Sequence, residues 1–293
     1  MKVMRHKSLQ RMWIFIFVAP AVAMFLLMYI WPLILAAFSS FTRWNGFTQM
    51  KFVGFENYIE LFKDRNFSQA MINTIWWSLL GTFVHVPWGV WLALILSRKP
   101  RGWRFVRSVY MFPNIISGAG MSLLFIFIYK PKSGALNSIL HAIGLNIDRN
   151  WLLEPDTAFM AVTSMWLWYA AVITLITLAE LLSISPEIYE AARIDGANDF
   201  QIDWFINIPL VKRIIGTGII ITVTSAFKTF DIIYMTTNGG PGNKTLNLAV
   251  MMVNNVIRQN RYGYANAIGM VLLVLGVGVM AANSAIFKMS KED

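Results

Sequence analysis

The sequence predicts an all-α membrane protein with about six transmembrane helices in a single transmembrane domain that covers residues 1–293. Of these residues, 57% are hydrophobic and only 14% are charged, whereas charged residues make up about 25% of an ordinary soluble domain. Several apolar stretches also reach the roughly 20 residues that a helix needs to cross a hydrocarbon core. The predicted spans are Met12–Phe38, Asn73–Leu96, Ser108–Tyr129, Phe159–Leu182, Ile214–Met235 and Tyr264–Phe287.

The positions of the charges predict the orientation of the chain in the membrane. Its net charge of +10 is typical of a membrane protein, in which Lys and Arg act as topology signals, and we expect no nucleic-acid partner. If the N-terminus is cytoplasmic, so is the short, strongly basic loop between the second and third spans. This loop contains Arg98, Lys99, Arg101, Arg104 and Arg107. Because cytoplasmic loops carry the excess of Lys and Arg, both termini are expected in the cytoplasm.

Prolines lie within the first three predicted spans, at Pro20, Pro32, Pro87 and Pro113. Membrane helices tolerate proline because neighbouring groups can pair with the backbone groups that it leaves free. We therefore expect kinks in these spans and not breaks.

The longest predicted cytoplasmic segment, residues 183–213, has the pattern of two short helices. The run Ser185–Glu187 is a helix start, with an N-cap residue, a proline in the first turn and an acid that the helix dipole favours. Gly196 is a candidate C-cap for this helix, and Asn198 can cap the next one.

In the second of these helices, apolar residues recur every four positions, at Phe200, Trp204 and Ile208, and Pro209 is expected to close the unit. Such an amphipathic pair can be buried against the ends of the protein's own spans, or it can dock a partner subunit. Periodicity alone favours neither interpretation.

The residues of this segment resemble a known motif. The run Glu190-Ala191-Ala192-Arg193-Ile194-Asp195-Gly196-Ala197, followed by Pro209, is similar to the EAA loop of permease subunits in binding-protein-dependent ABC importers. The blocks Phe230–Pro241 and Gly263–Ala267 resemble the end of the fifth span and the start of the sixth in carbohydrate-uptake permeases of the maltose and glycerol-phosphate type. Within that group, the Gly-Gly-Pro block resembles the first of two paired permeases. We call residues 183–213 the EAA loop.

This resemblance implies a MetI-like permease core in a bacterial cytoplasmic (inner) membrane, and a subunit that is not itself an enzyme. The implied partners are a second homologous permease, two ATP-binding cassette subunits that bind ATP and Mg²⁺, and an extracytoplasmic solute-binding protein. The implied solute is a sugar or a related polyol. The implied ATPase-coupling residues are Glu190, Ala191, Ala192, Asp195, Gly196, Ala197, Phe200, Trp204 and Pro209. Asp203 departs from the family pattern, which has an aromatic or large apolar residue there, so we expect the contact surface to shift onto Trp204 and Phe205.

The motifs of the chain predict neither catalysis nor a cofactor. Gly239–Thr245 superficially resembles a phosphate-binding loop, but it lacks the glycine immediately before the lysine and the strand-to-helix context of such loops. We interpret it as a glycine-rich outer turn. His6, His85 and His141 lie in different segments, and the chain has no cysteine, so neither a metal site nor a catalytic residue is predicted.

The fifth span offers one set of candidates for the solute path. Thr222, Ser225 and Thr229 share a face of this helix with Ala226, and hydroxyl groups in such a stripe can bind a sugar. The alternative is helix packing, which uses the same small residues.

The fourth span offers the second set, Trp168 and Tyr169, together with Trp166. Their rings provide the flat surfaces that stack on sugar rings, although aromatic residues at these positions can equally belong to the core.

Lys228 and Asp231 lie three residues apart in the fifth span, where charge is costly. We expect a structural role for Asp231 and leave Lys228 open. The alternative function is a stand-alone secondary transporter of small polar solutes, which should show inverted repeats and carboxylates near the middle of the membrane. A membrane enzyme, the other alternative, needs His, Asp or Cys clustered near one interface. The sequence shows neither pattern.

Overall fold

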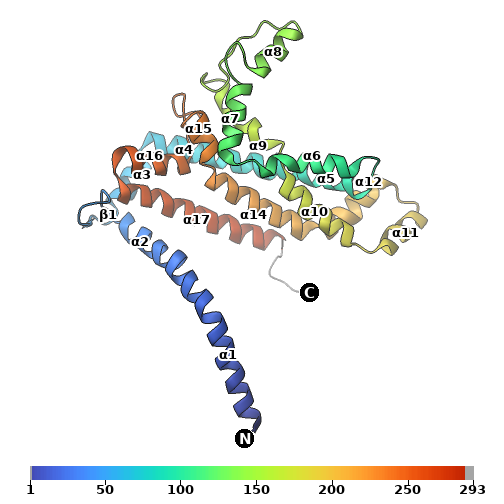
Figure 1. Cartoon of the computed structure of the whole chain (residues 1–293), viewed down its shortest axis with the longest axis horizontal. Coiled ribbons are helices and arrows are strands. Elements are labelled where there is room, and N and C mark those ends of the chain that lie inside the picture. Colours follow the sequence, from blue (N-terminus) through green and yellow to red (C-terminus); the bar gives the residue numbers. More distant parts are fainter. Residues whose placement is uncertain (1, 288–293) are drawn as a thin grey trace. The chain divides into compact units, whose positions relative to one another are not determined.

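Helices form almost wherever the sequence predicts a span, and Figure 1 shows their order along the chain. The computed structural model describes residues 2–287, with the side chains of residues 13–287. Among them, five helical stretches are long and apolar enough to cross a membrane. They are Trp13–Ser40, Arg65–Ser97, Ala158–Ser183, Lys212–Thr236 and Tyr262–Phe287. The number rises to six if the bent pair Trp103–Ile115 and Gly118–Ile128 counts as one span.

The chain packs into two units, each described by itself. Unit 1 comprises the residues up to Lys63 and Met252–Val271, and unit 2 comprises Asp64–Met251 and the residues from Leu272 onward. The elements before Asp64 are α1 (Lys2–Phe25), η1 (Leu26–Ile30), α2 (Trp31–Ser40), β1 (Thr42–Arg43), β2 (Lys51–Phe52) and α3 (Glu56–Lys63). The next are α4 (Arg65–Leu80), η2 (Gly81–His85), α5 (Val86–Ser97), α6 (Trp103–Met111), η3 (Phe112–Ile115), α7 (Gly118–Ile128), α8 (Ala135–Ala142), α9 (Ala158–Leu167) and α10 (Ala171–Ser183). The last are α11 (Pro186–Ile194), α12 (Asp199–Ile202), η4 (Asp203–Asn207), α13 (Ile208–Leu210), α14 (Lys212–Lys228), α15 (Asp231–Thr236), α16 (Leu248–Gln259) and α17 (Tyr262–Phe287).

Unit 1 is organised around a short hairpin. β1 and β2 pair antiparallel, with Thr42 opposite Phe52. The buried amide of Asn57 donates hydrogen bonds to the carbonyl oxygens of Ser40 (2.8 Å) and Thr42 (2.9 Å), which ties α3 to the end of α2. Gly263 lies so close to the hairpin that a Cβ atom there would be 1.9 Å from the Thr42 carbonyl oxygen. Only glycine allows this approach.

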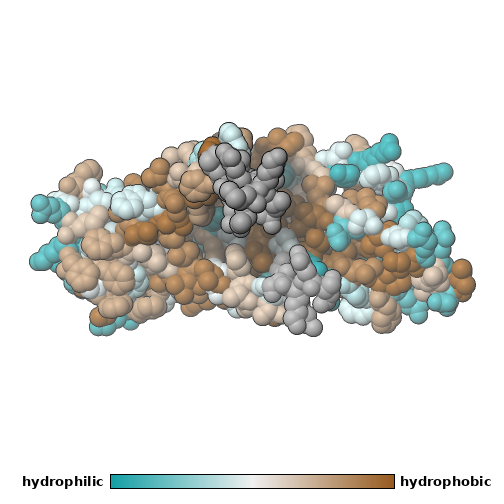
Figure 2. Space-filling model, turned by 90° about the horizontal axis from the view of Figure 1, so that it is seen from below, coloured by the Kyte–Doolittle hydropathy of each residue, from teal (hydrophilic) through white to brown (hydrophobic). Residues whose placement is uncertain are grey.

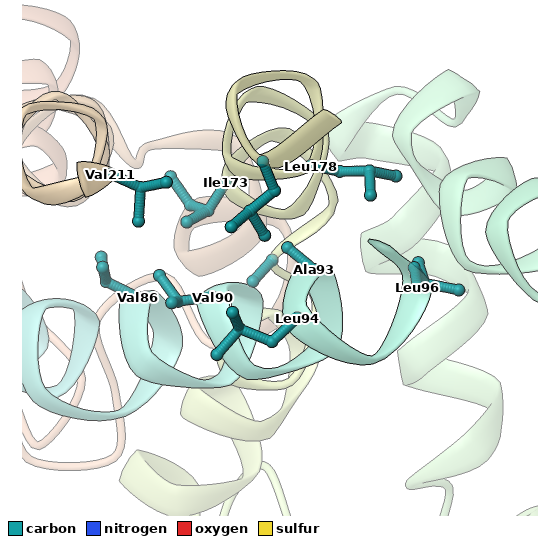
Figure 3. Packing of buried hydrophobic residues seen from close by; sticks show 10 residues of the cluster. Val86, Val90, Ala93, Leu94, Leu96, Ile173, Leu178 and Val211 are labelled. Carbon is teal, nitrogen blue, oxygen red and sulfur yellow. The ribbon is translucent and has the colours of Figure 1, made fainter. Parts of the chain in front are cut away.

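The core of unit 2 forms where α5 crosses α10. Figure 3 shows Val90 and Ala93 of α5 facing Ile173 of α10, with Val211 beside them. Gly89 permits the close crossing, because a Cβ atom there would lie 2.9 Å from the Cβ atom of Ile173. Small residues at a helix crossing are the usual means of packing in membranes, where the lipid tails are as apolar as the side chains.

Three wide turns, each with one residue more than an α-helical turn, precede three of the prolines. In η1, η2 and η4 the closing N–H bonds to the carbonyl oxygen five residues earlier, and the next residue is a proline. These prolines are Pro32, Pro87 and Pro209. Because a proline ring clashes with the carbonyl group four residues earlier, a wide turn at this point relieves the clash and lets the helix continue.

The expectation that the helices continue is confirmed for Pro20, Pro32 and Pro87, each of which lies inside one long helical stretch. The expectation that Pro209 closes the unit before the fifth span holds to within one residue, because α13 ends at Leu210 and the turn residue Val211 precedes α14. The wide turn η4, directly before Pro209, lets the helix run through the proline to this end.

The prediction of a kink without a break is wrong at Pro113, so the third predicted span is not one helix. α6 and η3 lead to a bend of 102°, after which α7 begins. The Ser117 hydroxyl group accepts a hydrogen bond from the N–H of Gly120 (3.2 Å) and so caps the new helix. The run Pro113–Gly118 contains Pro, Asn, Ser and Gly, which all favour turns, and it therefore ends α6 locally. Figure 1 shows α7 and α8 projecting away from α6.

Two of the long spans contain a short break, one between α9 and α10 and one between α14 and α15. A break inside a membrane frees backbone groups that lipid cannot pair, so protein groups must do so. At the second break the amide of Asn247 donates to the carbonyl oxygen of Thr229 (2.6 Å). The break is thus paired from another part of the chain.

Lys228 and Asp231 lie on either side of this second break. Lys228 is the last residue of α14 and Asp231 the first of α15, where the helix dipole favours a cation and an anion, respectively. The Asp231 carboxylate also lies against Gly118, with an oxygen 3.1 Å from the position of a Cβ atom there. This placement favours a structural role for both charges.

The glycine-rich segment Gly239–Thr245 lies between α15 and α16, and so it lacks the preceding strand of a phosphate-binding loop. The buried amide of Asn73 on α4 donates to the carbonyl oxygens of Leu246 (2.7 Å), Lys244 (3.1 Å) and Asn243 (3.2 Å). The segment is therefore a turn that is held in place from α4.

Candidate functional site

A cavity of about 210 Å³ lies between the helices of unit 2. Residues from α4, η2, η3, α9 to α10, α14 and α15 line it, and its wall is mostly apolar. The wall includes Trp77, His85, Asn114, Trp166, Tyr169, Ile173, Ile221, Thr222, Ser225, Ala226, Thr229 and Ile233. Small-molecule sites usually take this form, an apolar cavity with a few polar groups.

The predicted stripe of the fifth span lines this cavity. Thr222, Ser225, Ala226 and Thr229 all contribute to its wall. Thr222 is buried, and its hydroxyl group has no hydrogen-bond partner among the residues that the structure describes. The Thr229 hydroxyl group donates to the backbone carbonyl oxygen of Ser225 (2.8 Å). An unpaired buried hydroxyl group costs free energy.

The aromatic candidates of the fourth span separate into two groups. Tyr169 and Trp166 line the cavity. Trp168 is outside it, because this residue is 54% exposed and packs edge-on against Trp88, with 5.5 Å between the ring centroids. The structure therefore brings Tyr169 together with the stripe on α14 and places Trp168 apart from it.

Three residues of the cavity wall that carry polar side-chain atoms, Trp77, His85 and Asn114, were not predicted from the sequence. The indole N–H of Trp77 donates to the hydroxyl group of Thr163 (2.8 Å), and its ring stacks on that of Phe159. A lone histidine in a span gives no signal of function. The wide turn η2 that contains His85 is a structural signal of function, because turns of this kind are frequent at functional sites.

In the EAA loop, Gly196 ends the first helix as predicted. It takes the left-handed conformation, with φ +82°. The N–H of Ala197 bonds to the carbonyl oxygen of Ala192 (2.9 Å), and the N–H of Gly196 bonds to that of Arg193 (3.1 Å). This pair of hydrogen bonds is a Schellman motif, which requires a left-handed residue at the Gly196 position.

The second helix of the loop also begins as predicted, since Asn198 and Gln201 form a capping box at the start of α12. Ser185 occupies the N-cap position of α11, but its hydroxyl group donates to the carboxylate of Glu187 and does not cap the backbone.

Large apolar side chains of the EAA loop are exposed. Ile194 is 86% exposed, Phe200 72%, Phe205 70% and Trp204 58%. Figure 2 shows hydrophilic residues gathered at the end of unit 2 that carries α11 and α12, beside a broad hydrophobic surface. Exposed apolar groups on a polar end of a protein are typical of an interaction surface.

Phe200, Trp204 and Phe205 line two separate concave surfaces. The rings of Phe200 and Trp204 stack, with 6.3 Å between centroids, and line a groove with Pro87 and Trp91 of α5. Phe205 lines a separate shallow depression, which it shares with three of the predicted coupling residues. These residues are Asp195, Gly196 and Ala197. Of the other predicted coupling residues, Glu190, Ala191 and Pro209 are exposed and Ala192 is buried.

Asp203, the departure from the family pattern, links the two helices of the loop to the end of α5. Its carboxylate forms an ion pair with Arg98, which also lies 3.4 Å from the carboxylate of Asp199. Its other oxygen accepts a hydrogen bond from the amide of Asn207 (2.8 Å), and the Asn207 oxygen accepts one from the hydroxyl group of Tyr189 (2.8 Å). Burial, and then the charge of Asp203, raise the pKa of the Tyr189 hydroxyl group, which keeps it protonated as a donor. We call these residues the Asp203 network.

Acidic and histidine side chains form no cluster in the described part of the chain that could hold a metal ion. The fold and the site define a membrane transport subunit, with a cavity between its spans and an exposed two-helix loop. Residues 85–288 match the family described as "Binding-protein-dependent transport system inner membrane component".

Similar proteins agree with this match. A probable ABC transporter permease protein, YurN of Bacillus subtilis (strain 168), is 34% identical and covers 95% of this chain and 97% of its own. The multiple sugar-binding transport system permease protein MsmF of Streptococcus mutans is 31% identical, and the match covers 94% of this chain and 95% of MsmF. A chain in the crystal structure of a bacterial ABC transporter involved in alginate import has the same fold, with a TM-score of 0.84 at 22% identity. The match covers 98% of this chain and 99% of that one.

The chain belongs to the family of binding-protein-dependent transport system inner membrane components. It is a multi-pass inner membrane protein and the permease subunit of an ABC importer, so the resemblance found in the sequence is confirmed. It works with a solute-binding protein, and ATP is hydrolysed by partner subunits and not by this chain.

Proposed function

We propose that the chain is one of two homologous permeases that form the path of a sugar or a related polyol across the membrane. Relatives named for a multiple sugar-binding system, for starch degradation products and for diacetylchitobiose support this class of solute. The observation that carries the proposal is the cavity, in which Tyr169 and Trp166 meet the hydroxyl stripe of α14. Aromatic rings pack on the apolar faces of a sugar, and hydroxyl groups pair with its edges.

A reconstituted transporter tests this proposal. The chain, its second permease, the ATP-binding subunits and the binding protein are placed in proteoliposomes with radiolabelled glucose, maltose, raffinose, sorbitol or glycerol 3-phosphate. We expect ATP-dependent uptake of at least one of these solutes. Ser225→Ala removes one hydroxyl group from the cavity wall and should raise the KM of uptake about threefold.

Ser78→Ala is the matched control, since the Ser78 hydroxyl group donates to the Thr74 carbonyl oxygen (2.8 Å) on α4 and does not line the cavity. It should leave KM unchanged. Uptake of none of the five solutes, together with ATP-dependent uptake of an amino acid, would overturn the proposed class of solute.

The proposal also covers the partner subunits of this chain, residues 1–293. The second permease completes the path, and two ATP-binding cassette subunits each receive the EAA loop of one permease. The depression beside Phe205, at Asp195, Gly196 and Ala197, is the centre of the contact, and Trp204 extends it. ATP-driven closure of these subunits moves α11 and α12 and switches the path between inward and outward access.

This arrangement requires both termini and the EAA loop to be cytoplasmic, as the basic loop after α5 supports. The natural absence of cysteine allows a direct test. In spheroplasts, a membrane-impermeant maleimide should label Lys132→Cys, whereas Arg101→Cys should react only after the membrane is permeabilised. The reverse pattern would contradict the proposed orientation.

A further inference from the structure

The break between α9 and α10 is paired by side chains from two other spans. α9 ends at Leu167 and α10 begins at Ala171, and Leu167 and Ala170 are buried. Backbone groups freed at this depth in a membrane have no water to pair with, so their partners must come from the protein. The break also lies at the cavity, since Trp166 and Tyr169 on either side of Leu167 line its wall.

Tyr110 of α6 pairs with both sides of the break. Its hydroxyl group donates to the carbonyl oxygen of Trp168 (2.8 Å) and accepts from the N–H of Ala170 (2.8 Å). A single hydroxyl group therefore satisfies one acceptor and one donor that a continuous helix would have paired internally.

His85 of η2 pairs with the end of α9. Its Nδ1 atom lies 3.2 Å from the carbonyl oxygen of Trp166 and 3.1 Å from that of Leu167. Carbonyl oxygens only accept hydrogen bonds, so Nδ1 must carry the proton, and in the neutral ring Nε2 is then an acceptor. The ring of His85 also lines the cavity.

We propose that His85 and Tyr110 are positioning residues of the solute path, which hold this break open and so fix Trp166 and Tyr169 in the cavity wall. Four backbone groups of the break, three carbonyls and one N–H, are bound by these two side chains. Irregular backbone at membrane depth occurs where it lines a cavity, and here it does so. This inference rests on the proposed function, because the wall matters only if the solute passes it.

Tyr110→Phe is the direct test, because it removes the hydroxyl group and keeps the ring. Tyr129→Phe is the matched control, since the Tyr129 hydroxyl group joins the end of α7 to the Ser164 side chain of α9 and does not bind the backbone groups of the break. Hydrogen–deuterium exchange on the assembled transporter should become about tenfold faster in peptides across Trp168–Thr174 for Tyr110→Phe, and not for Tyr129→Phe.

Uptake kinetics give the second readout, with whichever of the five labelled solutes the wild-type transporter carries. Tyr110→Phe should raise KM about fivefold and leave the maximal rate within twofold, because the wall is loosened while the coupling loop is untouched. If this variant fails to assemble, His85→Phe serves in its place, with the same expected split.

Three other outcomes overturn the inference. Unchanged exchange shows that Tyr110 does not hold the break. Faster exchange with unchanged KM shows that the break is held but does not shape the path, and a KM shift in Ser225→Ala then leaves the proposed function standing. Uptake of none of the five solutes by the wild type, together with ATP-dependent uptake of an amino acid, ends the proposed function and this inference with it.

Discussion

A Gly196→Trp variant is expected to reach the membrane but to lose its ATP-binding subunits during purification, with uptake reduced roughly tenfold or more. Gly196 has φ +82°, and a Cβ atom there would meet nothing within 4 Å in this chain. A side chain at this position therefore starts in open space, at the depression proposed to receive the partner. Left-handed strain adds about 1–2 kcal/mol for a residue with a Cβ atom.

Gly144→Trp separates this strain from the loss of docking. Gly144 has φ +87° and equally open space around its Cβ position, but it lies after α8 and not in the EAA loop. Co-purification of the ATP-binding subunits should survive this change. If Gly196→Trp retains both the ATP-binding subunits and wild-type uptake, the coupling role of the loop is refuted.

Charge reversal at Asp203 is expected to lower uptake about tenfold while ATP hydrolysis continues, so that fewer solutes are carried per ATP. Asp203→Arg places two cations together at the Arg98 position and leaves the Asn207 amide without its acceptor. The Asp203 side chain is only 19% exposed, so solvent screens this repulsion incompletely. The helices of the EAA loop then lose their fixed position against α5.

The exchanged pair Arg98→Asp with Asp203→Arg is the control, because it restores opposite charges at the same two positions. It should recover most of the ratio of solute carried to ATP hydrolysed, whereas Arg98→Asp alone should not. Solute uptake and phosphate release measured on the same proteoliposomes give this ratio, which does not depend on the amount of assembled transporter. An unchanged ratio in both single variants would show that the Asp203 network takes no part in coupling.

The elements that could be predicted from the sequence depend on neighbours along the chain. Gly196 and Asn198 were predicted as caps because a cap pairs with groups only a few residues away. The stripe Thr222–Thr229 was likewise visible from helical spacing. Proline shows the limit of this reasoning, since Pro87 lies in a continuous helix and Pro113 at a bend. The difference comes from the wide turn before Pro87 and the turn-forming residues after Pro113.

The cavity could not be predicted in the same way, because it depends on contacts between distant segments. Tyr169 meets the stripe of α14 across the cavity beside a break in its span, and that break is paired by His85 and Tyr110 from other spans. Asp203 shows the same limit. Its departure from the family pattern was visible in the sequence, whereas its link to Arg98 needed the fold.

The wide turn before Pro87 also decides which side chains of its span point the same way. Trp77 and His85 are separated by eight positions, since 85 − 77 = 8, and on an uninterrupted α-helix they would point about 80° apart at roughly 100° per residue. The extra residue of η2 takes up about one of those steps, which reduces the divergence to about 20°. The turn that accommodates the proline thus aligns the indole and the imidazole, and both line the cavity. A helical wheel drawn through Arg65–Ser97 without this step would place them at the two edges of one face, about 80° apart.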